Sequence, residues 1–325
     1  MRFLVRRLGF YLIALAVAVT INFALPRLMP GDPVQLMFAR FQGRLDPRAM
    51  ESLYETFGFV QGPIFTQYTT YISNLLQGDL GLSIAQFPQP VSEALGIGIG
   101  WTLRLVGLAT IIAFVFGVLL GIGAAWKRGG LVDSIVLPIT GLLSAFPYFW
   151  LAMLILYGLA LGAGLFPLRH AYDVNMNRDW SSPEFVLNVV HHMMLPALTI
   201  VITSIGGWML GMRNNMIGVL SEDYITMAQA KGLSDRRIRY TYAARNAILP
   251  SITGFAMSLG FVLGGALLTE IVFSYPGMGY TLLLAVNARD YPLMQGGFLM
   301  ITLAVLLANM IADFAYVLLD PRVRA

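Results

Sequence analysis

Two long apolar runs are separated by Ser221-Glu222-Asp223-Tyr224-Ile225-Thr226-Met227-Ala228-Gln229-Ala230-Lys231-Gly232-Leu233-Ser234-Asp235-Arg236-Arg237, a segment that continues to Leu249-Pro250. The pattern predicts a short helix, a glycine that ends it, and a second helix. A plain connection between membrane helices does not need this helix–glycine–helix pattern, whereas a surface that docks a partner does. We therefore expect residues 218–250 to carry the function.

The first predicted helix has a polar start and one mixed face. Asp223 can cap it, because a side-chain oxygen there accepts a hydrogen bond from a free backbone amide of the first turn. Tyr224, Met227, Ala228 and Lys231 follow at helical spacing and share one face. Two interpretations stay open. The segment is either a basic connector or a docking helix whose small alanine face enters a groove on a cytoplasmic partner.

Gly232 is expected to end this helix, since glycine adopts the positive φ that follows a helix at little steric cost. Ser234 or Asp235 would begin the next helix, which extends through Arg245. Pro250 lacks an amide donor and suits the first turn of the apolar helix that follows.

The composition excludes several classes of protein. Of the 325 residues, 57% are hydrophobic and only 12% are charged, whereas a soluble domain has about 25% charged residues. An integral membrane protein is therefore predicted. The absence of cysteine excludes disulfides and thiolate metal sites, and no phosphate-binding Gly-x-x-x-x-Gly-Lys-Ser/Thr loop occurs. The histidines His170, His191 and His192 predict no metal site, and the basic residues show no nucleic-acid-binding pattern.

A membrane-spanning helix needs about 20 mainly apolar residues. Six runs predict an all-α membrane protein with six transmembrane helices: 8–28, 101–126, 134–161, 193–217, 251–273 and 293–319. Three parts follow. Residues 1–28 hold the N-terminus and first helix, 29–100 form an outer segment, and 101–325 form a five-helix core that includes 218–250. Amphipathic helices near 46–58 and 63–78 would pack on the spans or meet an external solute-delivering protein.

The basic residues predict the orientation through the positive-inside rule. The short loops on one side carry only Arg169, Arg178 and Arg289. A cleaved signal peptide is disfavoured because the first apolar run is long and Leu25-Pro26-Arg27 is a poor cleavage site. Both termini are therefore expected in the cytoplasm, on the side that carries Arg2, Arg6, Arg7, Lys127, Arg128, Arg213, Lys231, Arg236, Arg237, Arg239, Arg245, Arg322 and Arg324.

The third span is interrupted by Phe146-Pro147-Tyr148-Phe149-Trp150. Proline removes a helical hydrogen bond, so Pro147 should kink the span. Phe146, Pro147, Tyr148 and Trp150 then form either a gate or wall of a translocation pathway, or a structural kink with aromatic packing. Glu270 is a further pathway candidate, because intramembrane ionisable groups often mark function, and it should lie near the outer mouth of the fifth span.

Small residues four apart permit close helix crossing in lipid. Four pairs of glycines have this spacing: Gly117/Gly121, Gly158/Gly162, Gly207/Gly211 and Gly260/Gly264. Together they predict tightly packed helices. At each pair, packing within the chain is favoured over an interface between subunits.

An ordered series of motifs covers nearly the whole chain. In 218–250 it consists of Tyr224-Ile225, Ala228-Gln229-Ala230-Lys231-Gly232-Leu233-Ser234 and Arg245-Asn246-Ala247-Ile248-Leu249-Pro250. Elsewhere it consists of Pro30-Gly31-Asp32-Pro33, Gln77-Gly78-Asp79-Leu80-Gly81, Phe273-Ser274-Tyr275-Pro276-Gly277-Met278-Gly279, Asp290-Tyr291-Pro292 and Leu319-Asp320-Pro321-Arg322. The series resembles permease subunits of ABC importers, and more narrowly the dipeptide/oligopeptide/nickel permeases. Thr226 stands where the general importer motif has an acid, so no salt bridge is implied there.

The resemblance implies the ABC-importer permease fold and a transport subunit that is not an enzyme. It implies a second homologous permease in a heterodimer, two cytoplasmic ATPase subunits that bind ATP and Mg²⁺, and an extracytoplasmic solute-binding protein. This chain would bind no cofactor and would cross the plasma (inner) membrane of a bacterium several times, in contact with lipid. The residues implied to couple to the ATPases are Asp223, Tyr224, Met227, Ala228, Ala230, Lys231, Gly232, Leu233, Arg245, Asn246 and Pro250.

Other functional classes predict different features. An ion-coupled secondary transporter, the main alternative, needs ionisable or ion-coordinating groups near the middle of its spans, and the central thirds of these spans have few acids or bases. An intramembrane enzyme needs a nucleophile with a base, or a metal cluster, and the sequence offers neither pattern. Peptides are the favoured solute, oligosaccharides are a close alternative, and nickel is disfavoured because the chain has few metal-binding side chains.

Overall fold

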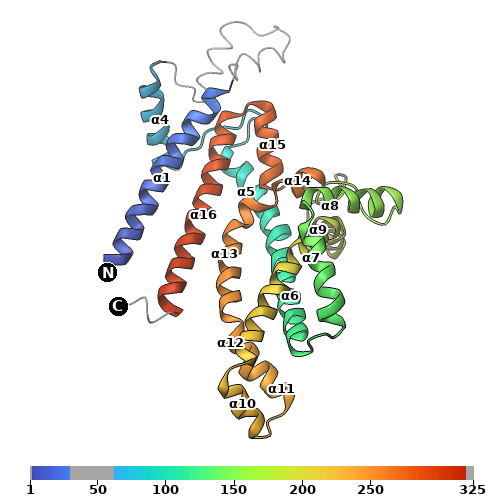
Figure 1. Ribbon diagram of the computed structural model, residues 1–325. Coiled ribbons are helices and arrows are strands. Elements are labelled where there is room, and N and C mark those ends of the chain that lie inside the picture. Colours follow the sequence, from blue (N-terminus) through green and yellow to red (C-terminus); the bar gives the residue numbers. More distant parts are fainter. Residues whose placement is uncertain (1, 30–61, 320–325) are drawn as a thin grey trace. The chain divides into compact units, whose positions relative to one another are not determined.

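The computed structural model describes residues 2–29 and 62–319, and their regular structure is helical (Figure 1). Within these ranges the nearest approach to a strand is an isolated bridge between Leu82 and Pro90. The all-α prediction is confirmed. The predicted helix at 46–58 and the motifs Pro30-Gly31-Asp32-Pro33 and Asp320-Pro321-Arg322 lie outside the described residues.

The chain forms two compact units. The first comprises the described residues of Met1–Trp101 and Pro276–Leu306, and the second comprises those of Thr102–Tyr275 and Leu307–Ala325. The first unit contains α1 (Arg2–Leu28), α4 (Ile64–Leu76), α5 (Val91–Thr102, ending at the boundary), α15 (Met278–Ala288) and the first part of α16 (Tyr291–Leu319).

The second unit contains a longer series of helices, in which η1 to η4 are π-helical stretches that continue their α-helical neighbours. In chain order they are η1 (Leu103–Gly107), α6 (Leu108–Trp126), η2 (Val132–Val136), α7 (Leu137–Ala145), α8 (Tyr148–Ile155), η3 (Leu156–Gly162), α9 (Pro183–Leu220), α10 (Asp223–Ala230), α11 (Asp235–Arg237), η4 (Ile238–Ala244), α12 (Arg245–Ala247), α13 (Leu249–Gly265) and α14 (Leu267–Val272).

In the first unit, α4 packs on α1. The rings of Tyr68 and Phe23 lie 5.1 Å apart, and the Tyr68 hydroxyl is hydrogen-bonded to Thr20 Oγ1 at 2.9 Å. Arg27 Nε donates to Gln67 Oε1 at 3.1 Å. The amphipathic helix predicted near 63–78 is α4. Of its two predicted alternatives, the structure shows packing on a span, with Gln67 and Tyr68 facing α1.

Asp290 fixes the loop before α5 to the start of α16. Its side chain is fully buried, and Oδ2 accepts hydrogen bonds from Ser83 Oγ at 2.6 Å and Ala85 N at 2.9 Å. Its Oδ1 accepts a third from Leu293 N at 3.0 Å, which caps α16. Burial raises the pKa of Asp290 from its ordinary value, and these hydrogen bonds oppose the rise. The Asp290-Tyr291-Pro292 motif therefore starts α16 and holds a distant loop.

The second unit is built on the contact between α6 and α9. The two backbones approach closely because Gly117 and Gly121 have no side chain. A Cβ added at Gly117 would lie 2.6 Å from Trp208 Cβ, and one at Gly121 would lie 2.5 Å from Met209 O. The prediction of close packing is confirmed for this pair.

A second close contact was not predicted. A Cβ at Gly206 would lie 2.6 Å from Thr140 O, so α7 also approaches α9 through a glycine. The pairs Gly158/Gly162 and Gly207/Gly211 differ. A Cβ would meet nothing within 4 Å at Gly158, Gly207 and Gly211, and one at Gly162 would lie 3.2 Å from Tyr157 O. The surroundings of Gly260 and Gly264 are outside what the structure describes.

Replacing Gly121 by alanine is expected to destabilise the protein by about 1–3 kcal/mol, the usual cost of overpacking. Gly211→Ala is the matched control, because its added methyl group enters open space. Within a helix, alanine stabilises the folded state by about 0.5–1 kcal/mol relative to glycine, so Gly211→Ala should be slightly more stable than the wild type. Thermal denaturation of both purified variants in detergent measures the two effects, and equal shifts would contradict the close contact at Gly121.

In the part of the chain that the structure describes, four helices are long and apolar enough to cross a membrane: Arg7–Leu28, Val91–Trp126, Pro183–Leu220 and Tyr291–Ile311. The first three contain the predicted runs 8–28, 101–126 and 193–217, and the fourth covers most of the run 293–319. The bent pair Val132–Ala145 and Tyr148–Gly162 covers the predicted run 134–161 and would be a fifth. The run 251–273 is not one continuous helix, because Ala266 separates α13 from α14. Hydropathy does not register this break, and the count of six stays a prediction.

The break at Pro147 is sharper than the predicted kink. Phe146, after the end of α7, is extended with ψ 141°, and Pro147 precedes the first residue of α8. Proline disfavours a helical conformation in the residue before it, which explains why α7 ends here. The helices on the two sides of the break differ in direction by 103°, and α8 runs across α7 in Figure 1.

Candidate functional site

Residues 218–250, called the α10–α12 segment below, lie at the end of the second unit where α6 and α9 end (Figure 1). Ile225 and Ala228 of α10 are buried in one apolar cluster with side chains of η4, α12, α6 and α9. The members from these other elements are Ile238, Ala243, Ala244, Ala247, Val118, Ile122, Ala125, Met212 and Met216. Because packed interiors transmit displacement, a force on α10 would reach α6 and α9 directly.

The end of α10 is built on Gly232. Its φ is +70°, its N–H donates to Gln229 O at 2.9 Å, and Leu233 N donates to Ala228 O at 3.3 Å. These two bonds are the Schellman arrangement, and Leu233 also packs against the cluster that contains Ala228. A Cβ at Gly232 would meet nothing within 4 Å, so φ and not space demands glycine. The prediction that Gly232 ends this helix with a positive φ is confirmed.

The predicted capping by Asp223 is wrong. The N-cap residue of α10 is Glu222, and no side chain makes a capping hydrogen bond there. Asp223 is the first helical residue, where its negative charge interacts favourably with the helix dipole. Ser234 occupies the N-cap position of α11, and Pro250 lies in the first turn of α13, as predicted.

A hydrogen bond joins the two ends of the α10–α12 segment. Asn246 Nδ2 donates to Tyr224 OH at 2.9 Å and to Tyr242 O at 3.1 Å. Tyr224 lies in α10 and Asn246 in α12, so the bond holds the helices together at the surface. In the sequence, only the resemblance groups these residues, because no local pattern indicates a contact across 22 residues.

The exposed surface of α10 is not the predicted alanine face. Ala228 is only 3% exposed and is covered by this chain, so it is not open to a partner. Met227 is 59% exposed and Tyr224 38% exposed, which gives the surface an adaptable thioether and an aromatic ring. Leu233 is half-buried, and the remaining exposed candidates are Asp223, Ala230, Lys231, Gly232, Arg245, Asn246 and Pro250.

An ion pair that the sequence analysis missed holds α9 to η2. Arg213 donates from Nε to Asp133 Oδ1 at 2.5 Å and from Nη2 to Oδ2 at 3.3 Å. Gly129 N also donates to Asp133 Oδ2, at 2.9 Å. The signal was present, because Asp133 is an acid at the start of an apolar run on the same predicted membrane face as Arg213.

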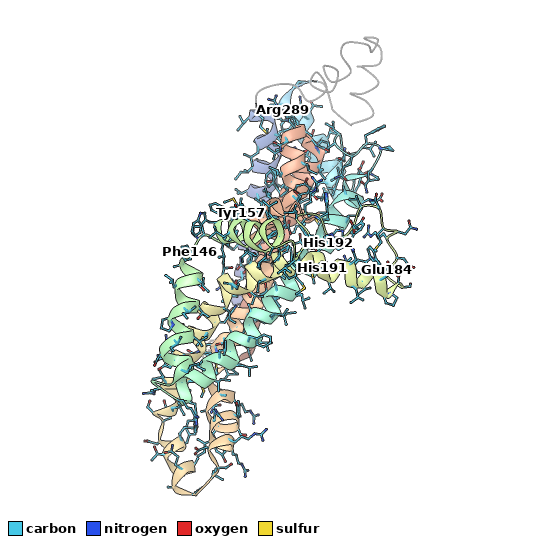
Figure 2. The ribbon with its side chains drawn as sticks, turned by 90° about the vertical axis from the view of Figure 1, so that its right-hand side faces the viewer. Phe146, Tyr157, Glu184, His191, His192 and Arg289 are labelled. Atoms are coloured by element: carbon cyan, nitrogen blue, oxygen red, sulfur yellow. The ribbon has the colours of Figure 1, made fainter. Side chains whose placement is uncertain are left out.

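The predicted pathway residues around the break are partly exposed. Phe146 and Trp150 stack with ring centroids 5.2 Å apart, and Figure 2 shows Phe146 at the end of α7 and Tyr157 on the helical stretch after the break. Tyr148 lines a cavity of about 230 Å³ between η1, α6, α8, α9, α13 and α14. Tyr148, a predicted pathway residue, is therefore placed at a cavity.

Glu270 is a buried packing group in this structure. Its side chain is 1% exposed and accepts a hydrogen bond from Thr102 Oγ1 at 2.6 Å. The Tyr275 backbone N–H donates to Glu270 O at 2.8 Å. Burial raises the pKa of the Tyr275 phenol, and the nearby Glu270 raises it further. Glu270 thus joins the end of α14 to the start of the η1–α6 helix.

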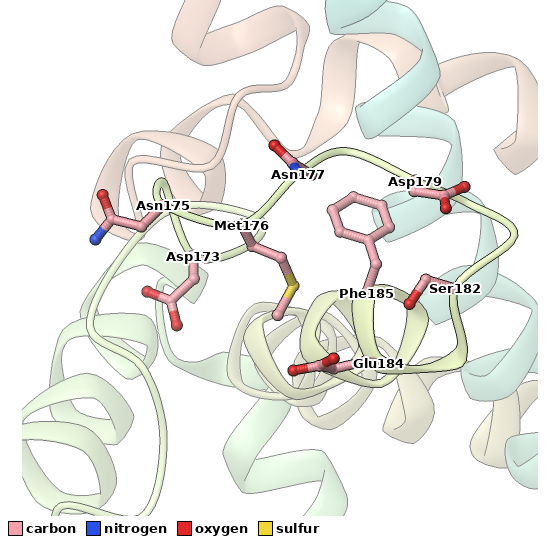
Figure 3. A pocket seen from close by; sticks show the side chains of 8 residues that line it. All are labelled: Asp173, Asn175, Met176, Asn177, Asp179, Ser182, Glu184 and Phe185. Atoms are coloured by element: carbon pink, nitrogen blue, oxygen red, sulfur yellow. The ribbon is translucent and has the colours of Figure 1, made fainter.

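A second cavity, of about 530 Å³, lies at the start of α9 (Figure 3). Its polar walls are Asp173, Asn175, Asn177, Asp179, Ser182 and Glu184. The Phe185 side chain anchors the loop above it, with its ring centroid 5.3 Å from that of Tyr172 and 5.2 Å from that of Trp180. The sequence shows these charges only as a mixed loop, because the fold brings the carboxylates together.

The histidine pair makes helix contacts. His191 Nε2 lies 3.1 Å from Leu165 O, and His192 Nδ1 lies 2.9 Å from Asn188 O. Both side chains are on α9, some distance from Glu184 at its start (Figure 2). No group of three or more potential metal ligands occurs in the ranges that the structure covers.

Two family descriptions match the chain. Residues 117–325 match "Binding-protein-dependent transport system inner membrane component", and residues 1–98 match the N-terminal part of such membrane components. The di/tripeptide transport system permease protein DppB of Pseudomonas aeruginosa is 34% identical over 334 residues, which cover 99% of this chain and 98% of that protein.

Two further relatives carry related names. The dipeptide transport system permease protein DppB of Escherichia coli is 33% identical over 341 residues, covering 100% of this chain and 99% of the relative. The oligopeptide transport system permease protein AppB of Bacillus subtilis is 29% identical over 303 residues, covering 93% of each.

These matches extend over the apolar helices and the α10–α12 segment alike. They agree with a helical protein that crosses the inner membrane several times and works in a transport complex with other subunits. The chain belongs to the family of inner membrane components of binding-protein-dependent transport systems, as a permease subunit of an ABC importer.

Proposed function

We propose that this chain is the permease of an ATP-driven peptide importer, in which α10 receives the movement of cytoplasmic ATPase subunits. One observation carries the proposal. The helix α10 exposes Met227 and Tyr224 on one side and shares a buried cluster with α6 and α9 on the other. A partner that displaces α10 would therefore move the helices that form the wall of the pathway.

The proposed complex contains a second, different permease, two ATPase subunits that hold ATP and Mg²⁺, and an extracytoplasmic binding protein. This chain binds no cofactor and supplies half of the pathway. In the proposed topology six helices cross the membrane, with α13 and α14 together as the fifth and both termini in the cytoplasm. In this topology the chain divides into residues 1–28, 29–100 and 101–325, with the α10–α12 segment in the cytoplasm.

The solute assignment rests on the relatives, whose names specify di-, tri- and oligopeptides. Oligosaccharides are the alternative that the experiment must separate from peptides. The proposed pathway elements are Phe146, Pro147, Tyr148 and Trp150, where the chain turns by 103° and leaves aromatic rings exposed. Glu270 would act by holding helix ends together instead of touching the solute.

The test is uptake by the complete complex reconstituted in lipid vesicles with its binding protein. We expect accumulation of radiolabelled dialanine that needs hydrolysable ATP and stops with a non-hydrolysable analogue. Maltose, offered in place of dialanine, should not accumulate. Uptake without ATP, driven by an imposed ion gradient and by this chain alone, would instead support a secondary transporter.

A further inference from the structure

We propose that the 230 Å³ cavity beside Tyr148, called the hydroxyl cavity below, holds a peptide bond of the solute during its passage. This inference rests on the proposed function and names a binding site for it. The cavity lies wholly within the second unit, between the helices that pack on α9. By volume it has room for roughly seven or eight water molecules, at about 30 Å³ each.

The lining indicates the class of ligand. None of its described residues is charged, and six carry hydroxyl groups: Thr110, Tyr148, Thr203, Ser204, Ser258 and Thr269. A hydroxyl group both donates and accepts, so such a wall can pair with the N–H and the C=O of a peptide bond. With no charged side chain in its wall, the cavity would not select among peptides by the charge of their side chains.

Thr269 provides the observation that demands a ligand. Its side chain is 0% exposed, and its Oγ1 has no hydrogen-bond partner among the described residues. Buried hydroxyl groups are nearly always paired, because an unpaired one loses its hydration without compensation. The hydroxyls of Thr203 and Ser258 already donate to carbonyl groups of their own helices. Thr269 therefore gains more than Thr203 or Ser258 from an incoming carbonyl or amide.

An aromatic cluster borders the cavity on the side nearer α10. Trp208 lines the cavity one helical turn beyond Ser204, and its ring centroid lies 5.2 Å from that of Phe114. Phe114 stacks on Phe255 at 4.3 Å. Rings from α6, α9 and α13 thus meet at one level, so a solute held by the hydroxyl groups rests against a wall that these three helices must separate to open.

The first test measures transport with the hydroxyl removed at constant size. Thr269→Val is expected to raise the KM for dialanine about three- to tenfold, the loss of one hydrogen bond, while Thr269→Ser stays close to wild type. Thr199→Val is the control, because Thr199 is equally buried but donates to Leu195 O of its own helix. A purely structural Thr269 predicts an unchanged KM in Thr269→Val, which would overturn the proposal.

The second test locates the solute directly. The chain has no cysteine, so Ser204→Cys places a single thiol in the cavity, and Ser134→Cys places one on the exposed start of η2. Saturating dialanine during turnover should slow alkylation by N-ethylmaleimide at least about fivefold at position 204 and leave position 134 unchanged.

The outcomes separate this proposal from the proposed function. ATP-dependent dialanine uptake without protection at position 204 would overturn the cavity assignment and leave the importer intact. Protection that persists without dialanine and disappears when lipid is removed would assign the cavity to lipid. Failure of the wild-type complex to take up dialanine would overturn the proposed function, and the ligand assignment with it.

Discussion

Uptake by the complete complex is expected to fall below about a tenth of the wild-type rate when Gly232 is replaced by proline, while ATP hydrolysis continues. Gly232 has φ +70° and donates its N–H to Gln229 O, and proline can do neither. Proline also pushes the preceding residue toward extended backbone, whereas Lys231 has φ −77° and ψ 2°. The end of α10 and its packing through Leu233 should be lost, so ATPase movement would no longer reach α6 and α9.

Gly232→Asn is the matched control for this variant. Asparagine enters the left-handed region more readily than other residues with a side chain, and a Cβ at position 232 has open space. Its uptake should remain near wild type. Membrane insertion of Gly232→Pro is checked by its yield in purified membranes. Normal ATP-coupled uptake in this variant would show that α10 is not the lever.

Asp290→Asn is expected to lower the thermal denaturation midpoint by about 5–10 °C, although the two side chains have the same shape. Both oxygens of Asp290 accept hydrogen bonds, from Ser83, Ala85 and Leu293. In Asp290→Asn an amide nitrogen replaces one of these oxygens. The nitrogen is itself a hydrogen-bond donor, and it would face the N–H or O–H donors that the oxygen accepts from in the wild type. The buried donors left unpaired should cost about 2–3 kcal/mol.

Asp79→Asn makes the same charge change at an exposed turn, where Asp79 Oδ1 accepts a hydrogen bond from Gly81 N at 2.8 Å. Its midpoint should move by no more than about 2 °C. Detergent-purified protein of both variants can be compared by the loss of monodisperse protein on heating. Equal midpoints for the two variants would show that the Asp290 contacts contribute little.

Periodicity and local residue chemistry predicted those helices and helix ends that depend only on residues close together in the sequence. Gly232 ends α10 because its φ is a local property, and Pro147 ends α7 through its effect on Phe146. The long apolar runs likewise appear as α1, α6, α9 and α16. A hydropathy count cannot register a change of direction, which is why the size of the turn at Pro147, 103°, and the break at Ala266 were not predicted.

The site was less predictable because its main contacts join residues far apart in the chain. The bonds from Asn246 to Tyr224 and from Arg213 to Asp133 depend on which helices pack together. The burial of Ala228 has the same origin. Its spacing on α10 assigns it to a face but does not say whether that face meets a partner or the chain's own α6 and α9.

The chain order of the first unit has a consequence for synthesis. Ser83 leaves the ribosome long before Asp290, which follows 207 residues later. At about 5–20 residues per second, the early helices wait roughly 10–40 seconds for the segment that completes their core. The residues from Thr102 to Tyr275 are all made in this interval. The nascent protein must therefore keep its first helices inserted without α15 and α16, which complete their apolar cluster, while the middle of the chain is still emerging.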